Sequence, residues 1–186
     1  MGFHITGDPA ADKVLDEYPF GLLTAMLLDQ QFPMERAFSG PAKVLERFGS
    51  LDPADIAAAD PEAFTALCST PPAVHRFPGS MAARIQALAA HIVAEYDGRT
   101  ERLWTEAASG RELLGRLQAL PGFGRQKAQI FVALLGKRLG MQPEGWAEAA
   151  GDYAEEGSYR SVADVVDGSS LDRVRAFKKE QKAAAK

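Results

Sequence analysis

The segment Leu120-Pro-Gly-Phe-Gly-Arg-Gln-Lys-Ala128 decides how this chain folds. Leu113, Leu117 and Leu120 recur at helical spacing, which predicts one apolar face on a helix that leads into the segment. Pro121 should end that helix, because the residue before a proline is pushed out of the α region. The pattern therefore predicts a helix that stops abruptly at the start of a turn.

The turn and the helix that follows it form a predicted phosphate site. Gly122 and Gly124 permit a tight reversal with positive φ, and a second helix is predicted to begin at Arg125. Gly124 has no side chain that could cap this helix, so the first amides stay free at the positive end of the helix dipole. Arg125 and Lys127 would flank a phosphate bound there. An αα-hairpin whose turn only reverses the chain is the alternative.

Composition and periodicity predict an all-α protein. The chain has 186 residues, of which 46% are hydrophobic and 25% charged, enough for one core or for two small lobes that share an interface. Strand patterns are nearly absent. We expect two helical lobes, one from residues 19–139 with the hairpin at 120–128, and one from residues 1–18 together with 140–186. Residues 140–168 should be rich in loops, and a last helix should begin at about Ser169.

The charge distribution is uneven. A net charge of −4 and a pI of about 5.4 argue mildly against general binding of nucleic acid. Between Gly110 and Gly140, however, there are six basic residues and one acidic residue, and the tail after Arg173 is also basic. Such a local patch favours an anionic partner, although a solvated helix face has the same pattern.

The hairpin segment resembles that of the helix-hairpin-helix base-excision DNA glycosylases, the superfamily of endonuclease III, adenine glycosylase and the alkylpurine glycosylases. The stretch Ala25-Met-Leu-Leu-Asp-Gln-Gln31 resembles an early helix of that family, which ends in paired glutamines. The stretch Ser80-Met-Ala-Ala-Arg-Ile85 resembles the start of a later helix, with Met81 in place of the usual Lys. The resemblance covers roughly Pro19 to Leu139.

The resemblance implies that a base is flipped out of the DNA stack, so that a wedge, a pocket and a carboxylate near the sugar are needed. Gln31 would be the wedge. The lysine nucleophile of bifunctional members falls at Gln126 in this chain, and Lys127 points about 100° away around the helix. We therefore expect no lyase activity. The implied DNA-binding residues are Gln31, Leu120, Gly122, Phe123, Gly124, Arg125 and Lys127. The implied base pocket is formed by Gln30, Gln126, Trp146 and Tyr153.

The catalytic acid is where this chain departs from the family. The family places an Asp in a Val-Asp-Thr-His-like segment after the hairpin, and this chain has Gln142-Pro-Glu-Gly-Trp-Ala147 instead. Glu144 occupies the matching window. Asp152, in Gly151-Asp-Tyr153, is the next candidate and is comparable to the Asp-Tyr pairing of some alkylpurine enzymes. The alternative for both acids is a solvated loop carboxylate.

Three functions follow from these patterns. The first is a monofunctional DNA glycosylase that removes a damaged base by water attack. The second is a non-catalytic protein that binds damaged or distorted DNA and has lost the carboxylate. The third is a helical interaction module in which the hairpin serves only for packing.

We also expect particular cofactors and partners. Cys68 is the single cysteine, so the four-cysteine iron-sulfur cluster of some relatives is not expected, and the three histidines lack metal-ligand spacing. The resemblance implies a monovalent cation held by hairpin carbonyls. The expected partner is damaged double-stranded DNA, bound by a monomer. No apolar run approaches the roughly 20 residues of a membrane span, so the expected location is the cytoplasm, at the nucleoid when DNA is bound.

Overall fold

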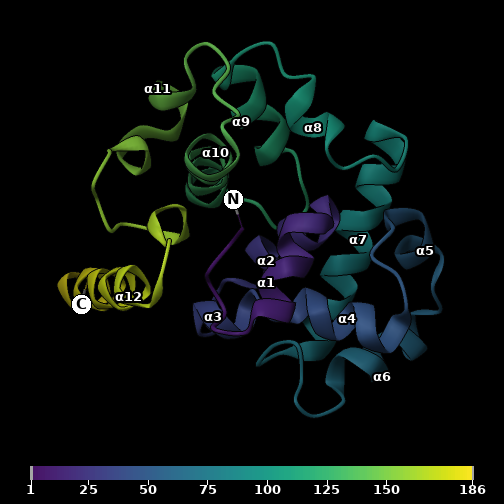
Figure 1. Ribbon diagram of the computed structural model, residues 1–186. Coiled ribbons are helices and arrows are strands. Elements are labelled where there is room, and N and C mark those ends of the chain that lie inside the picture. Colours follow the sequence, from purple (N-terminus) through teal and green to yellow (C-terminus); the bar gives the residue numbers. More distant parts are fainter. Residues whose placement is uncertain (1, 186) are drawn as a thin grey trace.

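The computed structural model describes residues 2–185, and this range contains helices and loops but no strand (Figure 1). The predicted all-α fold is confirmed. The helices are α1 (Pro9–Glu17), α2 (Pro19–Leu28), α3 (Met34–Ala37), α4 (Gly40–Phe48), α5 (Pro53–Ala58), α6 (Pro61–Ser69), α7 (Pro78–Tyr96), α8 (Arg102–Thr105), α9 (Gly110–Gln118), α10 (Arg125–Leu139), α11 (Trp146–Ala150), the 3₁₀ helices η1 (Gly151–Ala154) and η2 (Val162–Asp164), and α12 (Gly168–Ala184).

Asp-Pro pairs start several of the helices. Asp8, Asp52 and Asp60 each precede a proline in the first turn and accept a hydrogen bond from an amide of that turn, at 3.0, 2.9 and 3.0 Å. The carboxylate satisfies a free amide and complements the helix dipole, while proline supplies a helical φ at a position that needs no amide. These local signals explain why a chain with so many prolines is nevertheless helical.

The helices pack in two groups around a continuous hydrophobic core. Helices α1, α2 and α4 pack on one another, and α7 packs on α2, α5 and α6. In the other group α10 packs on α9, α11, η1 and η2. The buried residues of both groups belong to one cluster that runs from Phe3 to Val174. Every residue of α2 from Phe20 to Leu28 is buried, so α2 lies inside the molecule.

The packing runs across the predicted domain boundary. Helix α1 packs on α2 and α4, which belong to the predicted 19–139 lobe. The N-terminal segment also borders the start of α12, around a cavity of about 610 Å³ lined by Phe3, Ile5, Val166 and Leu171 among others. The division into lobes at 19 and 139 therefore stays a prediction.

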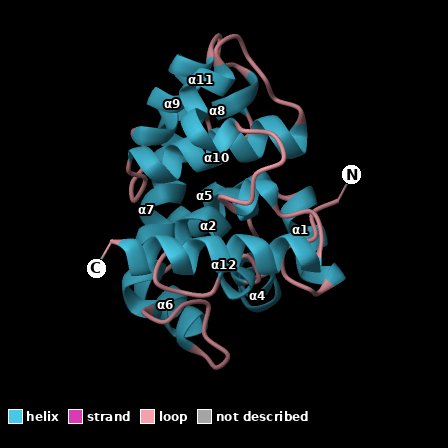
Figure 2. Cartoon of the chain, turned by 90° about the vertical axis from the view of Figure 1, so that its left-hand side faces the viewer, coloured by secondary structure: helices cyan, strands magenta, loops and turns pink. Residues whose placement is uncertain are grey.

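Helix α12 lies at the side of the molecule. Figure 1 shows it in yellow beside α3, and Figure 2 shows it running across one face with α10 and α11 above it. Ser170 and Val174 are its buried residues, whereas Leu171 and Phe177 are half-buried, so α12 packs on the body only in part. Among residues 2–185, no helix has both the length and the apolar composition needed to cross a membrane.

Candidate functional site

The turn of the hairpin is closed by a hydrogen bond between residues three apart, and its backbone conformation requires Gly122. The amide of Phe123 donates to the carbonyl of Leu120 at 3.1 Å. Gly122 has φ +84°, and a Cβ at this position would lie 2.6 Å from a methyl group of Leu27. Gly124 was expected to share the positive φ, but its backbone is extended, with φ −84° and ψ −179°. Only one of the two glycines is therefore required by the left-handed backbone.

The second hairpin helix begins at Arg125, as predicted, and its first turn has no side-chain cap. The space beside Gly124 is open, since a Cβ there would meet nothing within 4 Å. Arg125 is exposed. Free amides at the positive end of a fifteen-residue helix, next to an exposed guanidinium, suit an anionic oxygen such as a phosphate.

Two of the predicted DNA contacts are core residues instead. The side chains of Leu120 and Phe123 are 3% and 5% exposed, and Phe123 packs edge-on against Phe131 in α10. They hold the turn against the body because both are large and apolar. Their side chains cannot reach a nucleic acid, so only their backbone atoms remain available to one.

Lys127 also differs from its predicted role. Its Nζ donates to the carbonyls of Met26 at 2.6 Å, Asp29 at 3.2 Å and Leu27 at 3.5 Å, at and just beyond the end of α2. Burial lowers the pKa of Lys127 from 10.5 to about 8, although the Asp29 carboxylate acts in the opposite direction. The ammonium is therefore not free to flank a phosphate. It ties the hairpin to the loop that follows α2.

That loop, Asp29-Gln30-Gln31, carries the paired glutamines. The Gln30 carbonyl lies 2.8 Å from Nε2 of His75, and Nδ1 of His75 accepts the Phe77 amide at 2.9 Å. Because Nδ1 accepts, Nε2 carries the proton and donates to Gln30. The His75 side chain is buried, and burial lowers its pKa below 6.5. A neutral histidine of fixed tautomer thus anchors the loop.

The two glutamines have different environments. The side chain of Gln30 donates to the Leu27 carbonyl at 2.7 Å and accepts from Arg84 at 3.2 Å, so it is held in place. Gln31 is exposed and has φ +53°, a left-handed backbone that residues with a side chain rarely adopt. Such strain is retained where the surrounding structure fixes it, often at functional sites. Gln31 is thus the exposed residue of the pair, and its role as a wedge stays a prediction.

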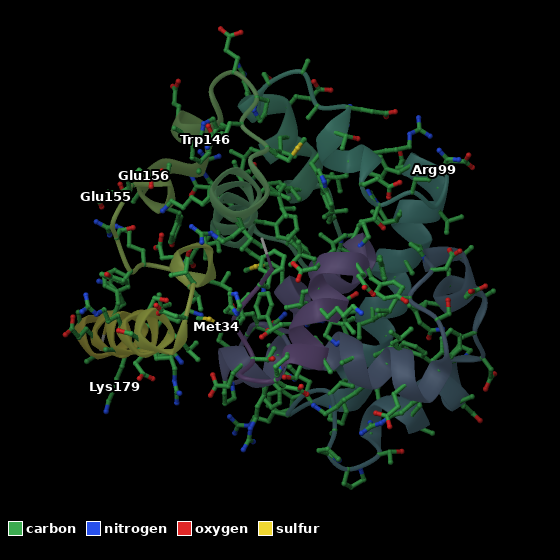
Figure 3. All side chains as sticks on the ribbon, in the orientation of Figure 1. Met34, Arg99, Trp146, Glu155, Glu156 and Lys179 are labelled. Carbon is green, nitrogen blue, oxygen red and sulfur yellow. The ribbon has the colours of Figure 1, made fainter. Side chains whose placement is uncertain are left out.

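A cleft of about 720 Å³ opens beside this loop and beneath α12. Its lining combines Asp29, Gln30, Gln31 and Gln126 with five basic residues, which are Arg76, Arg175, Lys178, Lys179 and Lys182. Figure 3 labels two of the lining residues, Met34 next to α12 and Lys179 on α12 itself. The volume falls within the range of small-molecule pockets, about 300–1,000 Å³.

Four of the five basic residues share one face of α12. Arg175, Lys178, Lys179 and Lys182 lie three, four and seven residues apart, the spacing of neighbours on a helix surface. Lys178 pairs with the carboxylate of Asp29, and Arg175 pairs with that of Glu35, each at 3.4 Å. These two ion pairs link α12 to the Asp29-Gln30-Gln31 loop and to α3.

A second cavity, of about 480 Å³, continues the cleft toward η1. Gln126 and Lys178 line both cavities, and Asp152 and Tyr153 line the second. The Gln126 amide donates to the Tyr153 hydroxyl at 2.9 Å. The predicted residues thus divide between two adjoining cavities: Gln30 and Gln31 line the first, Asp152 and Tyr153 line the second, and Gln126 lines both.

Glu144 and Trp146 are not part of this cleft. Glu144 is exposed, and its carbonyl accepts the amide of Gly110 at the start of α9, at 2.8 Å. The ring of Trp146 packs on Gly136, where a Cβ would lie 2.6 Å from the ring, and Figure 3 shows Trp146 away from α12. The chain passes the far end of α10 here and only then returns along it, where Gln129 donates to the Ala149 carbonyl at 3.1 Å.

Asp29 and the basic face of α12 were not among the residues predicted from the sequence. Asp29 stands directly before the paired glutamines, and its side chain is 6% exposed. A carboxylate that directly follows an apolar helix end could have been chosen from the sequence as a candidate site residue. The basic character of the tail is visible in the sequence. Its position against the Asp29-Gln30-Gln31 loop is not.

The hairpin carbonyls were expected to hold a monovalent cation. The Leu120 carbonyl already accepts the Phe123 amide, and residues 120–128 contain no acidic side chain. Backbone oxygens are therefore the only ligands that the turn itself offers. They fit a weakly held monovalent ion, and the cation stays a prediction.

Comparison with known proteins assigns the family. No curated protein and no solved structure matches the chain. The family model described as "HhH-GPD superfamily base excision DNA repair protein" matches residues 24–186. That range holds the paired glutamines, the hairpin, η1 and α12. The chain therefore belongs to the HhH-GPD superfamily of base excision DNA repair proteins.

Proposed function

We propose that this protein is a monofunctional DNA glycosylase, which hydrolyses the bond between a damaged base and its sugar. The observation that carries the proposal is the hydrogen bond from Gln126 to Tyr153. It brings an acid-bearing segment to the first turn of the hairpin helix, beside the paired glutamines. A wedge, a pocket and carboxylates would then lie in two adjoining cavities joined at Gln126, an arrangement that suits removal of a flipped base.

The environment of the lysines supports hydrolysis without lyase chemistry. Gln126 stands where bifunctional relatives carry their nucleophilic lysine, and an amide cannot form a Schiff base. The amine of Lys127 donates to three carbonyls of the α2 end. Lys178 lies in the cleft but is paired with Asp29. Water is therefore the nucleophile in this proposal.

DNA would be held at two places. The uncapped first turn of α10 and Arg125 offer donors to one backbone segment, and the basic face of α12 offers charge to another. Gln31 lies between them, exposed and fixed by the anchored loop. This arrangement grips phosphates without reading sequence, which suits an enzyme that searches for a lesion.

The test is to incubate the purified protein with duplexes that carry uracil, hypoxanthine, alkylpurines or oxidised bases. Alkali cleaves the strand at abasic sites, and borohydride traps Schiff bases. We expect release of one class of base without trapping. Trapping would contradict the monofunctional proposal, and loss of trapping in Lys178→Ala would then identify the nucleophile.

A non-catalytic damage-binding protein is the second candidate. It is favoured by the positions of the two acids chosen from sequence, because Glu144 lies outside the cleft and Asp152 is exposed at its rim. Preferential binding to mismatched, abasic or bulged duplexes, with no base released from any of them, would support this candidate.

A further inference from the structure

The Asp29-Gln30-Gln31 loop supplies a carboxylate that is not among the two acids predicted from the sequence. Asp29 is the single acid in the lining of the 720 Å³ cleft, where it lies among Gln30, Gln31 and Gln126. Its side chain is 6% exposed, in contrast to the exposed Asp152 and Glu144. A carboxylate that is nearly removed from water interacts more strongly with a charge inside the cleft than an exposed one does.

Asp29 is also held firmly. Its amide donates to the Met26 carbonyl at 3.3 Å, and its own carbonyl accepts from Lys127 at 3.2 Å. The next residue is anchored by His75. A group on such a frame needs little reorganisation when charge develops beside it, which is the basis of electrostatic catalysis.

The Asp29 carboxylate forms an ion pair with Lys178. Lys178 lies 3.4 Å from Oδ2 of Asp29, and the Lys178 side chain is 36% exposed while that of Asp29 is nearly covered. Lys178 belongs to the basic face of α12, so an entering phosphate competes with Asp29 for its ammonium. When Lys178 binds the phosphate, the space beside the Asp29 carboxylate becomes available to the positive charge that develops on the sugar.

We infer that Asp29 is the catalytic carboxylate of this cleft, in place of the acid that relatives carry after the hairpin. The inference rests on the proposed function. In the step, the bond between C1′ of the sugar and the base nitrogen breaks, and its electron pair leaves with the base. Asp29 stabilises the positive charge on the sugar and takes one proton from the attacking water, whose oxygen bonds to C1′. The proton then passes to the released base.

The test uses two abasic-site duplexes that require no knowledge of the lesion. One carries a pyrrolidine in place of the sugar, whose ring nitrogen is positively charged, and the other carries a neutral tetrahydrofuran. Transition-state mimics bind more tightly than neutral analogues, so the wild-type protein should prefer the cationic duplex by about tenfold or more. Asp29→Asn should lose this preference and keep its affinity for the neutral duplex, which also shows that the variant is folded.

The control variant is Asp172→Asn, which removes one negative charge from an exposed position on α12 and should keep the preference. Lys178→Met should increase the ratio of the two affinities, because the cation beside Asp29 is gone. If Asp29→Asn unfolds, Asp29→Glu keeps the charge and should retain a reduced preference.

Two results would overturn the inference: equal wild-type binding to both duplexes, or loss of the preference in Asp152→Asn rather than in Asp29→Asn. Neither result depends on base release. A wild-type protein that shows the Asp29-dependent preference but releases no base would contradict the proposed function alone.

Discussion

A lysine ammonium is held inside the protein at each end of α10, but different groups compensate its charge at the two ends. At the C-terminal end Lys137 pairs with Asp164 at 2.6 Å and donates to the Glu155 carbonyl at 2.7 Å, and the side chains of the pair are 3% and 5% exposed. At the N-terminal end Lys127 donates to backbone carbonyls at the end of α2, while the carboxylate of the neighbouring Asp29 pairs with Lys178. A directly paired opposite charge compensates the first ammonium, whereas carbonyl dipoles and the charge of Asp29 compensate the second only in part.

This difference separates a structural end of the helix from the end to which we assign a function. Asp164 also accepts the amide of Arg160 at 2.9 Å and the hydroxyl of Ser158 at 3.2 Å, so its oxygens are well satisfied. Around Lys127, by contrast, the helix is uncapped, and burial shifts the pKa of the amine to about 8. Groups with shifted pKa values and unused donors are typical of sites that bind or react.

The largest expected effect is at the structural end. Asp164→Asn leaves the buried Lys137 ammonium without its counter-charge, and breaking such a pair costs about 3–5 kcal/mol. Urea unfolding monitored by circular dichroism measures the loss. The double variant Lys137→Met with Asp164→Leu should recover much of it, since it removes both charges. A loss below about 1 kcal/mol in the single variant would show that Lys137 reaches water.

The functional end should respond less. Lys127→Met takes this donor away from the Asp29 carbonyl, whereas the Met26 and Leu27 carbonyls keep their other donors. The loss should therefore be about 1 kcal/mol, the lower end of the cost of an unsatisfied buried acceptor. DNA affinity should fall as well, because the loop with Gln31 loses its link to the hairpin. Both quantities can be measured on the same preparation, by urea unfolding and by fluorescence anisotropy with a labelled duplex. Unchanged affinity would mean that the other contacts of the loop, with His75, Arg84 and Lys178, are enough to position it.

The pH dependence of stability should also distinguish the two ends. The folded protein releases the Lys127 proton near pH 8, whereas the unfolded chain keeps it up to about 10.5. Between these values the unfolded state binds more protons, so the free energy of unfolding contributed by Lys127 rises with pH. Wild type should therefore gain stability relative to Lys127→Met from pH 8 to 10.5. Parallel stability curves for the two proteins would contradict the lowered pKa.

The smallest effect on stability is expected at the exposed residue of the functional end. Arg125→Glu should change the free energy of unfolding by less than about 0.5 kcal/mol, as surface substitutions usually do. It should nevertheless weaken DNA binding and reduce the salt dependence of binding by about one or two ions. Arg111→Glu, exposed at the start of α9, is the matched control and should leave binding unchanged. Equal losses in both variants would indicate a general charge effect.

Local features of the fold could be predicted from the sequence because they depend on short-range sterics. The start of α10 at Arg125 follows from the proline and glycines before it. The positive φ expected of Gly124 was wrong, because Gly124 is the N-cap residue of α10 and N-cap residues usually have an extended backbone.

The candidate site was predicted only in part, because its members are brought together by tertiary packing. Gln126 and Tyr153 were both chosen and do meet, but Glu144 was chosen by counting along a segment that first passes the far end of α10. Lys127 looked like a surface cation because nothing in the hairpin indicates that the end of α2 lies against it. Asp29 became a candidate only when α12 and its Lys178 were placed across the cleft.

The left-handed backbone of Gln31 has a consequence for how this sequence can change over generations or in the laboratory. A side chain in this conformation costs about 1–2 kcal/mol, which a glycine at the same position would not incur. Screening for heat resistance alone should therefore enrich glycine at position 31, and the same replacement would remove the wedge that we propose. Thermostable variants of this protein should accordingly be selected together with a DNA-binding assay, since a replacement of Gln31 that raises stability would be expected to weaken DNA binding.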